Sequence, residues 1–303
     1  MTLWVSEFQA LVAHEQQHQA NPSSNLYAIV DAALDRRLWQ QFARHGKASL
    51  PLLRRASSDS VAAGFIPHLV LLDHGSTSDA DAFAPFLMKL PPSPAFTLLS
   101  SPMPIDRLRD HFHAFLDVEL SGGLSIFLAF WDPAILGALV GQADDHTLHI
   151  PGPVFNPAQL GAFLAPLSGW WYTDRESRWH SIGIPEHTPP DHAGISLVRL
   201  TQEQEDQLIE AGLPDQVLYD LESEQPLLFP ADQPQADKYR SIRIALEAAR
   251  KTGLDDIRDL VNFVVLRLAY GERMQTDARI PPLLNQVRQK QMTLDQAMKL
   301  MPE

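Results

Sequence analysis

The sequence contains no cysteine among its 303 residues. This absence excludes disulfide bonds, a thiolate nucleophile and cysteine-ligated zinc, and it fits a reducing compartment. Basic residues are also few: 24 Lys and Arg against 37 Asp and Glu give a formal net charge of −13. Non-specific nucleic-acid binding needs a positive surface, so we expect no nucleic-acid partner.

Long apolar runs are missing as well. A membrane-spanning helix needs about 20 consecutive apolar residues, whereas the longest candidate, residues 260–270, is shorter and contains Arg267. Residues 1–20 are interrupted by Glu7, His14 and Glu15, unlike a signal peptide with its basic and apolar regions. We therefore expect a soluble, cytoplasmic protein without membrane insertion.

Recognisable catalytic motifs are absent from the sequence. It has no glycine-rich dinucleotide or phosphate loop and no Gly-x-Ser-x-Gly elbow. The most metal-like run is residues 144–149 (Asp-Asp-His-Thr-Leu-His), but zinc needs three or four converging ligands and the spacing supplies no companion set. His68, Asp73 and His74 cluster at the end of a predicted strand. We predict no catalytic residues, no metal site and no cofactor.

The first part of the chain alternates strand and helix patterns, which predicts a mixed α/β lobe. Residues 26–30 form an apolar run typical of a strand buried on both faces, and Leu34, Leu38 and Phe42 follow at helical spacing. Asp132 and Pro133 have the chemistry of an N-cap and a first helical residue. Further strands are expected at 65–72, 95–99 and 124–130, and further helices at 3–19, 79–90 and 105–116.

The last part of the chain predicts helices alone. Capping boxes occur at residues 201–204 and 293–296, and residues 254–270 form a long apolar helix pattern that starts at Asp255 and Asp256. Residues 184–197 are rich in proline and polar residues, as linkers are. The predicted organisation is a mixed α/β lobe (1–183), a linker (184–197) and an all-α lobe (198–303).

Two stretches far apart in the sequence resemble a known family. One is Asn-Leu-Tyr-Ala-Ile-Val-Asp at residues 25–31, and the other is Phe-Leu-Ala-Phe-Trp-Asp-Pro-Ala-Ile-Leu at residues 127–136. Together with the order of the later helices, they resemble the effector adaptor, or chaperone, family of bacterial type VI secretion, long catalogued as a domain of unknown function. The resemblance extends over most of the chain.

The resemblance implies a non-enzymatic protein. It would bind a toxic effector in the cytoplasm and help to load it onto the spike protein of the secretion machine. Two alternatives remain open: a metal-assisted hydrolase that uses the cluster at His68, Asp73 and His74, and an immunity protein that inhibits a toxin by binding it.

Aromatic and apolar residues at three places are candidate partner contacts. Adjacent tryptophans often divide between core and surface, and a helix that is apolar on more than one face is either buried or serves a second neighbour. The alternative for residues 260–270 is a core helix whose apolar faces all pack within its own lobe. The candidates are Trp131, Asp132, Trp170, Trp171, Phe263, Leu266 and Tyr270.

Overall fold

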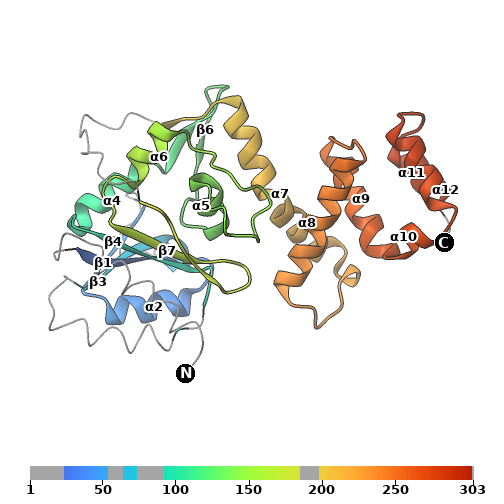
Figure 1. The fold of residues 1–303 in the computed structure, drawn as a ribbon. Helices are drawn as coiled ribbons and strands as arrows, with labels where there is room; N and C mark the ends of the chain where they lie inside the picture. The colour runs from blue at the N-terminus through green and yellow to red at the C-terminus, as the bar shows by residue number, and fades with distance from the viewer. Residues whose placement is uncertain (1–23, 54–63, 74–89, 91, 185–197, 302–303) are drawn as a thin grey trace. The chain divides into compact units, whose positions relative to one another are not determined.

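The computed structural model describes residues 24–53, 64–73, 90, 92–184 and 198–301 (Figure 1). Contacts between Cα atoms divide the chain into two units, Met1–Ala211 and Gly212–Glu303. The described part of the first unit contains strands and helices, and that of the second contains helices. The prediction of a mixed α/β region followed by an all-α region is therefore confirmed.

A six-stranded antiparallel sheet forms the centre of the first unit, with the order β2-β3-β1-β4-β7-β8. Its central strand β1 is the predicted strand at residues 26–30, and β3 and β4 confirm the strands predicted at 65–72 and 95–99. The strands are β1 (Asn25–Asp31), β2 (Ala48–Pro51), β3 (Pro67–Asp73), β4 (Phe96–Ser101), β7 (Gly169–Thr173) and β8 (Trp179–Ser181).

Both faces of this sheet are covered, which explains the continuous apolar run in β1. Tyr27 and Ile29 belong to one apolar cluster and Ala28 and Val30 to another, because successive side chains of a strand point to opposite faces. Figure 1 shows α2 (Arg36–His45) on one side of the sheet and α4 (Ile105–His113), α5 (Pro133–Val140) and α6 (Pro157–Leu164) on the other.

A second, three-stranded sheet has the order β6-β5-β9. Strands β5 (Asp117–Glu119) and β6 (Ser125–Phe127) form an antiparallel hairpin, and β9 (Val198–Arg199) pairs with β5 in parallel. The hairpin turns at the glycine pair of residues 122–123, where Gly123 has a φ of 79°, a left-handed conformation that glycine adopts without steric cost.

The helical part begins at α7, whose residues fall on both sides of the division between the units. Both predicted capping boxes are present, at Thr201 with Gln204 and at Thr293 with Gln296. The helices are α7 (Gln202–Glu224), η2 (Pro226–Leu228), α8 (Gln235–Lys251), α9 (Ile257–Tyr270), α10 (Arg273–Thr276), α11 (Ile280–Arg288) and α12 (Leu294–Leu300).

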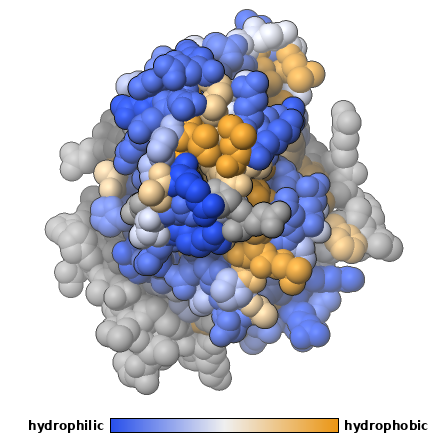
Figure 2. All heavy atoms as spheres, turned by 90° about the vertical axis from the view of Figure 1, so that its right-hand side faces the viewer, coloured by the Kyte–Doolittle hydropathy of each residue, from blue (hydrophilic) through white to orange (hydrophobic). Residues whose placement is uncertain are grey.

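Apolar residues of the helical unit form one core, to which α8 and α9 contribute most. Helix α9 begins at Ile257 after the Asp256 cap, later than the predicted start at residue 254, and Gly271 follows its end. Figure 2 shows that the face it views is largely hydrophilic, with apolar side chains gathered in patches. The large apolar side chains that this unit exposes are Tyr219, Leu227, Ile244, Ile257 and Leu300.

Two predicted elements differ in the structure, and one element was not predicted. The first helix starts at Arg36 after the Asp35 cap, so Leu34 lies outside it and is exposed. Strand β6 ends at Phe127 instead of residue 130, because the chain turns there before the Asp132 cap. Helix α6, which begins in a capping box at Asn156, was not predicted.

Several other predictions lie outside the described residues. These are the helices at 3–19 and 79–90 and, apart from residue 184, the linker at 184–197, so they stay predictions. Residues 198–211 fall in the first unit. Among the helices that the structure describes, none has the length and apolar character needed to cross a membrane.

Candidate functional site

The two stretches that carry the family resemblance are joined by a hydrogen bond. Trp131 donates its indole Nε1–H to Oδ2 of Asp31 over 3.0 Å, across a sequence separation of 100 residues. The other oxygen of Asp31 accepts the backbone N–H groups of Ala33 and Leu34, which fixes the turn after β1. The end of the central strand and the start of α5 are therefore held together by side chains from both stretches.

Asp132 has a local role beside this bond. Its Oδ1 accepts the backbone N–H of Ala134 over 2.8 Å, and Pro133 occupies the first turn of α5. At the other end of α5, Gly141 has a φ of 77° and ends the helix in a left-handed conformation. The predicted cap is confirmed, and α5 sends the chain into the segment of residues 142–150.

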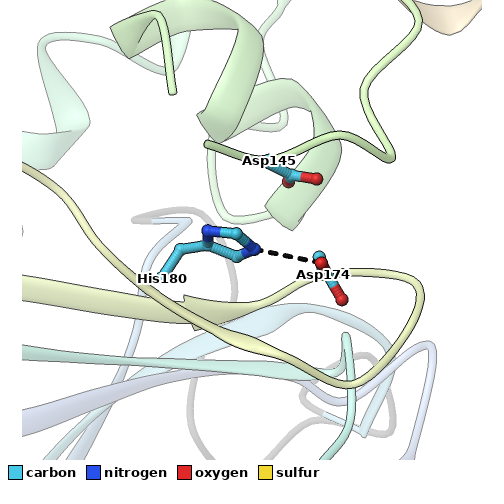
Figure 3. Close-up of side chains that lie close together, drawn as sticks. All are labelled: Asp145, Asp174 and His180. Atoms are coloured by element: carbon cyan, nitrogen blue, oxygen red, sulfur yellow. Dashed lines mark hydrogen bonds and ion pairs between the residues drawn. The ribbon is translucent and has the colours of Figure 1, made fainter. Parts of the chain in front are cut away.

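That segment meets the β7–β8 hairpin in a polar group that we call the His180 cluster: Asp144, Asp145, Tyr172, Asp174, Arg178 and His180. Figure 3 shows Asp145, from the segment after α5, above His180 and Asp174 of the hairpin. The side chains of Asp174 and His180 are 0% and 5% exposed, so their charges must be compensated inside the protein.

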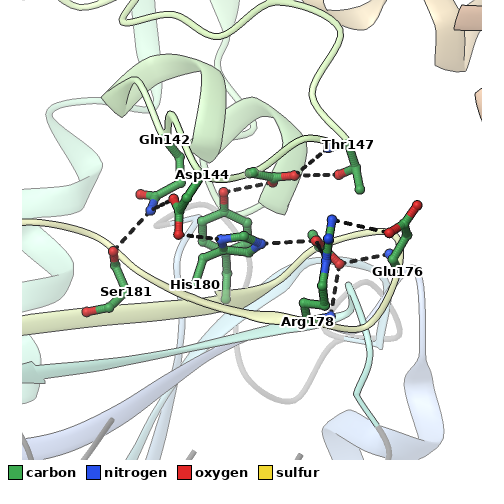
Figure 4. Close-up of polar contacts among 10 residues, drawn as sticks. Gln142, Asp144, Thr147, Glu176, Arg178, His180 and Ser181 are labelled. Atoms are coloured by element: carbon green, nitrogen blue, oxygen red, sulfur yellow. Dashed lines mark hydrogen bonds and ion pairs between the residues drawn. The ribbon is translucent and has the colours of Figure 1, made fainter. Parts of the chain in front are cut away.

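His180 lies between two carboxylates (Figure 4). Its Nε2 is 3.0 Å from Oδ2 of Asp174 and its Nδ1 is 3.2 Å from Oδ2 of Asp144. The ring stacks on Tyr172, whose hydroxyl donates to Oδ2 of Asp145 over 2.9 Å. Ionised carboxylates only accept hydrogen bonds, so both contacts are hydrogen bonds when each ring nitrogen of His180 carries a proton, as in an imidazolium ion.

The pKa values in the cluster follow from these contacts. Burial lowers the pKa of His180, but the hydrogen bond to Asp174 and the charges of Asp145 and Asp144 outweigh burial and raise it above its ordinary value. Burial raises the pKa of Asp174, but hydrogen bonds from His180 and Arg178 outweigh it and lower the pKa. Burial, followed by the charge of Asp145, raises the pKa of Tyr172.

The cluster has the residue types of a metal site, but the atoms that would bind a metal already take part in hydrogen bonds. One ligand atom from each of Asp145, Asp174 and His180 lies within 4.8 Å of the others. However, Asp145 accepts from Tyr172 and from Thr147, and Asp174 accepts from Arg178 and from His180. A doubly donating imidazolium has no free lone pair for a metal. The geometry is that of an internal charge network that fastens the segment after α5 to the hairpin.

The side chains of the metal-like run at residues 144–149 have different surroundings in the structure. Asp144 and Asp145 join the His180 cluster, whereas Nε2 of His149 is 3.1 Å from Oε1 of Glu210 and His146 is exposed. The companions of the two acids, Asp174 and His180, were missed. They come from the hairpin, about thirty residues further along, and no spacing rule links them to the run.

The other predicted histidine cluster is described only in part. His68 is buried in β3, with its ring centroid 4.7 Å from that of Trp39 and its Nδ1 3.5 Å from Oγ of Ser49. The side chain of Asp73 and the whole of His74 lie outside the described residues. Joint use of these three residues stays a prediction.

The predicted partner contacts are mostly inside the protein. Trp170 and Trp171 are both buried, on opposite faces of the sheet, so the expected division between core and surface does not occur. Trp131 is 8% exposed. Phe263 and Leu266 belong to the core of the helical unit. This burial corresponds to the alternative of a core helix that packs within its own lobe.

Two predicted contacts lie nearer the surface. Tyr270 is half-buried, and the guanidinium carbon of Arg273 lies 5.4 Å from its ring centroid. Asp132 is exposed, with one oxygen engaged in the cap. The other five side chains are buried in three apolar clusters, and their role as partner contacts stays a prediction.

Comparison with known proteins gives one match. A family model described as a domain of unknown function, DUF4123, matches residues 26–149. That range contains Asp31, Trp131 and the whole of residues 127–136. Neither the curated proteins nor the solved structures contain a significant match. Residues 26–149 are therefore similar to a family whose function is unknown.

Proposed function

We propose that this protein is a non-enzymatic adaptor of bacterial type VI secretion, which binds a toxic effector in the cytoplasm and helps to load it onto the spike protein. The observation that carries the proposal is the hydrogen bond between Trp131 and Asp31. It unites the two stretches on which the resemblance to the adaptor family rests. Both residues lie within the range that the family model matches, residues 26–149.

The geometry of the His180 cluster supports a binding role over a catalytic one. A general acid or base must reach its substrate, whereas the His180 side chain is 5% exposed and hydrogen-bonded from both nitrogens. The buried oxygens of Asp145 and Asp174 are likewise occupied by internal donors. The cluster acts through stability in this proposal and takes no part in chemistry.

The proposal is tested by deleting the gene in its native host and restoring it. We expect delivery of one effector to be lost and then recovered, while delivery of a second effector of the same machine stays unchanged. The full-length protein should also keep the first effector soluble on co-expression and co-purify with it. An effector that neither co-purifies nor depends on the gene would overturn the proposal.

The same strains separate the adaptor from an immunity protein. An immunity protein would protect a cell that expresses the toxin, and its deletion would leave delivery unchanged. An adaptor is needed for delivery from the producing cell. Loss of protection without loss of delivery would therefore favour the immunity protein.

A further inference from the structure

Strand β6 is an open edge of the three-stranded sheet among the described residues, where β5 is its one neighbour. The bonds from Leu128 N to Leu116 O and from Leu120 N to Leu124 O flank the β5–β6 pairing. Hydrogen-bonded and non-bonded pairs alternate in an antiparallel ladder, so Ser125 and Phe127 direct their backbone N–H and C=O groups away from β5. In the part of the chain that the structure describes, these groups make no hydrogen bond.

The outer face of this sheet combines the apolar ring of Phe127 with the carboxylate of Asp117, next to an ion pair between Glu119 and Arg199. Phe127 is 46% exposed and lies directly opposite Asp117 of β5. Asp117 is exposed and has no ion pair with any described residue. On the inner face, Val118 and Ile126 pack into the core of the first unit. The outer face is therefore free to accept an apolar side chain and a positive charge.

The family-like stretches hold this surface in place. The ring of Phe127 meets that of Trp131 edge-on, with centroids 5.5 Å apart, and Trp131 is fixed by Asp31. The same carboxylate accepts the backbone N–H of Leu34, whose side chain is 62% exposed. The buried bond thus positions exposed apolar groups beside it, and a pre-ordered surface loses less entropy when a partner binds.

We propose that β6 is a docking edge for an extended segment of the effector. The segment would add a strand through backbone hydrogen bonds to Ser125 and Phe127, place an apolar side chain against the Phe127 ring and direct a Lys or Arg towards Asp117. This inference rests on the proposed function and names one contact surface for it.

Backbone pairing and charge both point to this occupant. Strand addition derives affinity from main-chain hydrogen bonds and specificity from alternate side chains. Proteins protect an open edge with short strands, lysine, proline or an inward charge; β6 is short, at 3 residues, but it reads Ser-Ile-Phe and carries no lysine, proline or charge. A basic segment complements both Asp117 and the formal net charge of −13.

The test uses the full-length protein and a phage-displayed library of short random peptides. We expect selected peptides to combine an apolar residue with Lys or Arg. Ser125→Pro should weaken their binding about tenfold, because it removes an outward N–H and leaves the β5 ladder intact. Ser125→Ala, the matched control, keeps that N–H and should bind like the wild type.

A second pair of variants shows whether weaker binding comes from loss of the docking surface or from misfolding. Phe127→Ser should weaken binding, whereas Leu227→Ser, at a 98% exposed position of the helical unit, should not. Hydrogen exchange gives a direct readout: a bound peptide should slow exchange of the Ser125 and Phe127 amides. The docking edge would be overturned if the library yields no binders. It would also be overturned if neither Ser125→Pro nor Phe127→Ser weakens binding.

Co-purification of the effector distinguishes failure of the edge from failure of the adaptor. If the effector binds wild type and both variants equally, the docking edge is wrong and the adaptor stands. If the effector does not bind the wild-type protein, the adaptor itself is wrong.

Discussion

Replacing His180 by alanine should destabilise the first unit by about 3 kcal/mol. Removing one partner of a buried ion pair costs about 3–5 kcal/mol, since the other charge stays buried without compensation. The side chain of Asp174 is 0% exposed, but Arg178 still donates to it over 2.8 Å. Because that guanidinium stays in place after the substitution, we expect the lower end of the range.

The pH dependence of this contribution has a defined window. The pKa of His180 is raised from 6.5 on folding, so its contribution is complete below pH 6.5 and is lost as the pH rises through the folded pKa. The pKa of Asp174 is lowered from 3.8, so its contribution is complete above pH 3.8 and is lost as the pH falls through the folded pKa. The pair should stabilise most between these two values.

Tryptophan fluorescence can follow this unit alone. All 6 tryptophans lie in the first unit, so urea unfolding measured by their emission reports on it. The difference in unfolding free energy between wild type and His180→Gln should be largest in weak acid and shrink on both sides, because glutamine can donate one hydrogen bond but carries no charge. A difference that does not vary with pH would refute the assignment of a charged His180.

Four further predictions concern the rest of the chain. Trp131→Phe keeps the contact with Phe127 but removes the donor to Asp31, and should lower the unfolding free energy by about 1–2 kcal/mol; an unchanged urea midpoint would contradict that role. Asp132→Ala should lower the unfolding free energy by about 1 kcal/mol because the helix cap is lost. A loss of effector binding larger than this destabilisation explains would indicate that Asp132 also contacts the effector. Elemental analysis of untagged protein should find no stoichiometric metal, and a metal that disappears on replacing His180 would contradict the charge network. Limited proteolysis should cut first within residues 184–197, given their proline-rich, polar composition, and earlier cleavage within α9 would argue against a linker there.

Local chemistry made several elements predictable. The helix caps at Asp132, Thr201 and Thr293 were identified because a cap depends on a few neighbouring residues. The central strand was identified because a strand covered on both faces has a continuous apolar run. Helix α6 was missed although Asn156 and Pro157 carry the same cap chemistry, since its 8 residues are too few to show a clear helical period.

Local sequence patterns were enough to identify several helix caps and the central strand, and residues 26–149 match a family of unknown function. Only the tertiary structure decided the order of the strands, the hydrogen bond between Trp131 and Asp31 and the meeting of Asp145 with Asp174 and His180. The physical reason is the distance along the chain over which each kind of interaction acts. Caps and periodic patterns act over a few residues, whereas these contacts join distant segments through the packing of the whole first unit, which no local spacing encodes.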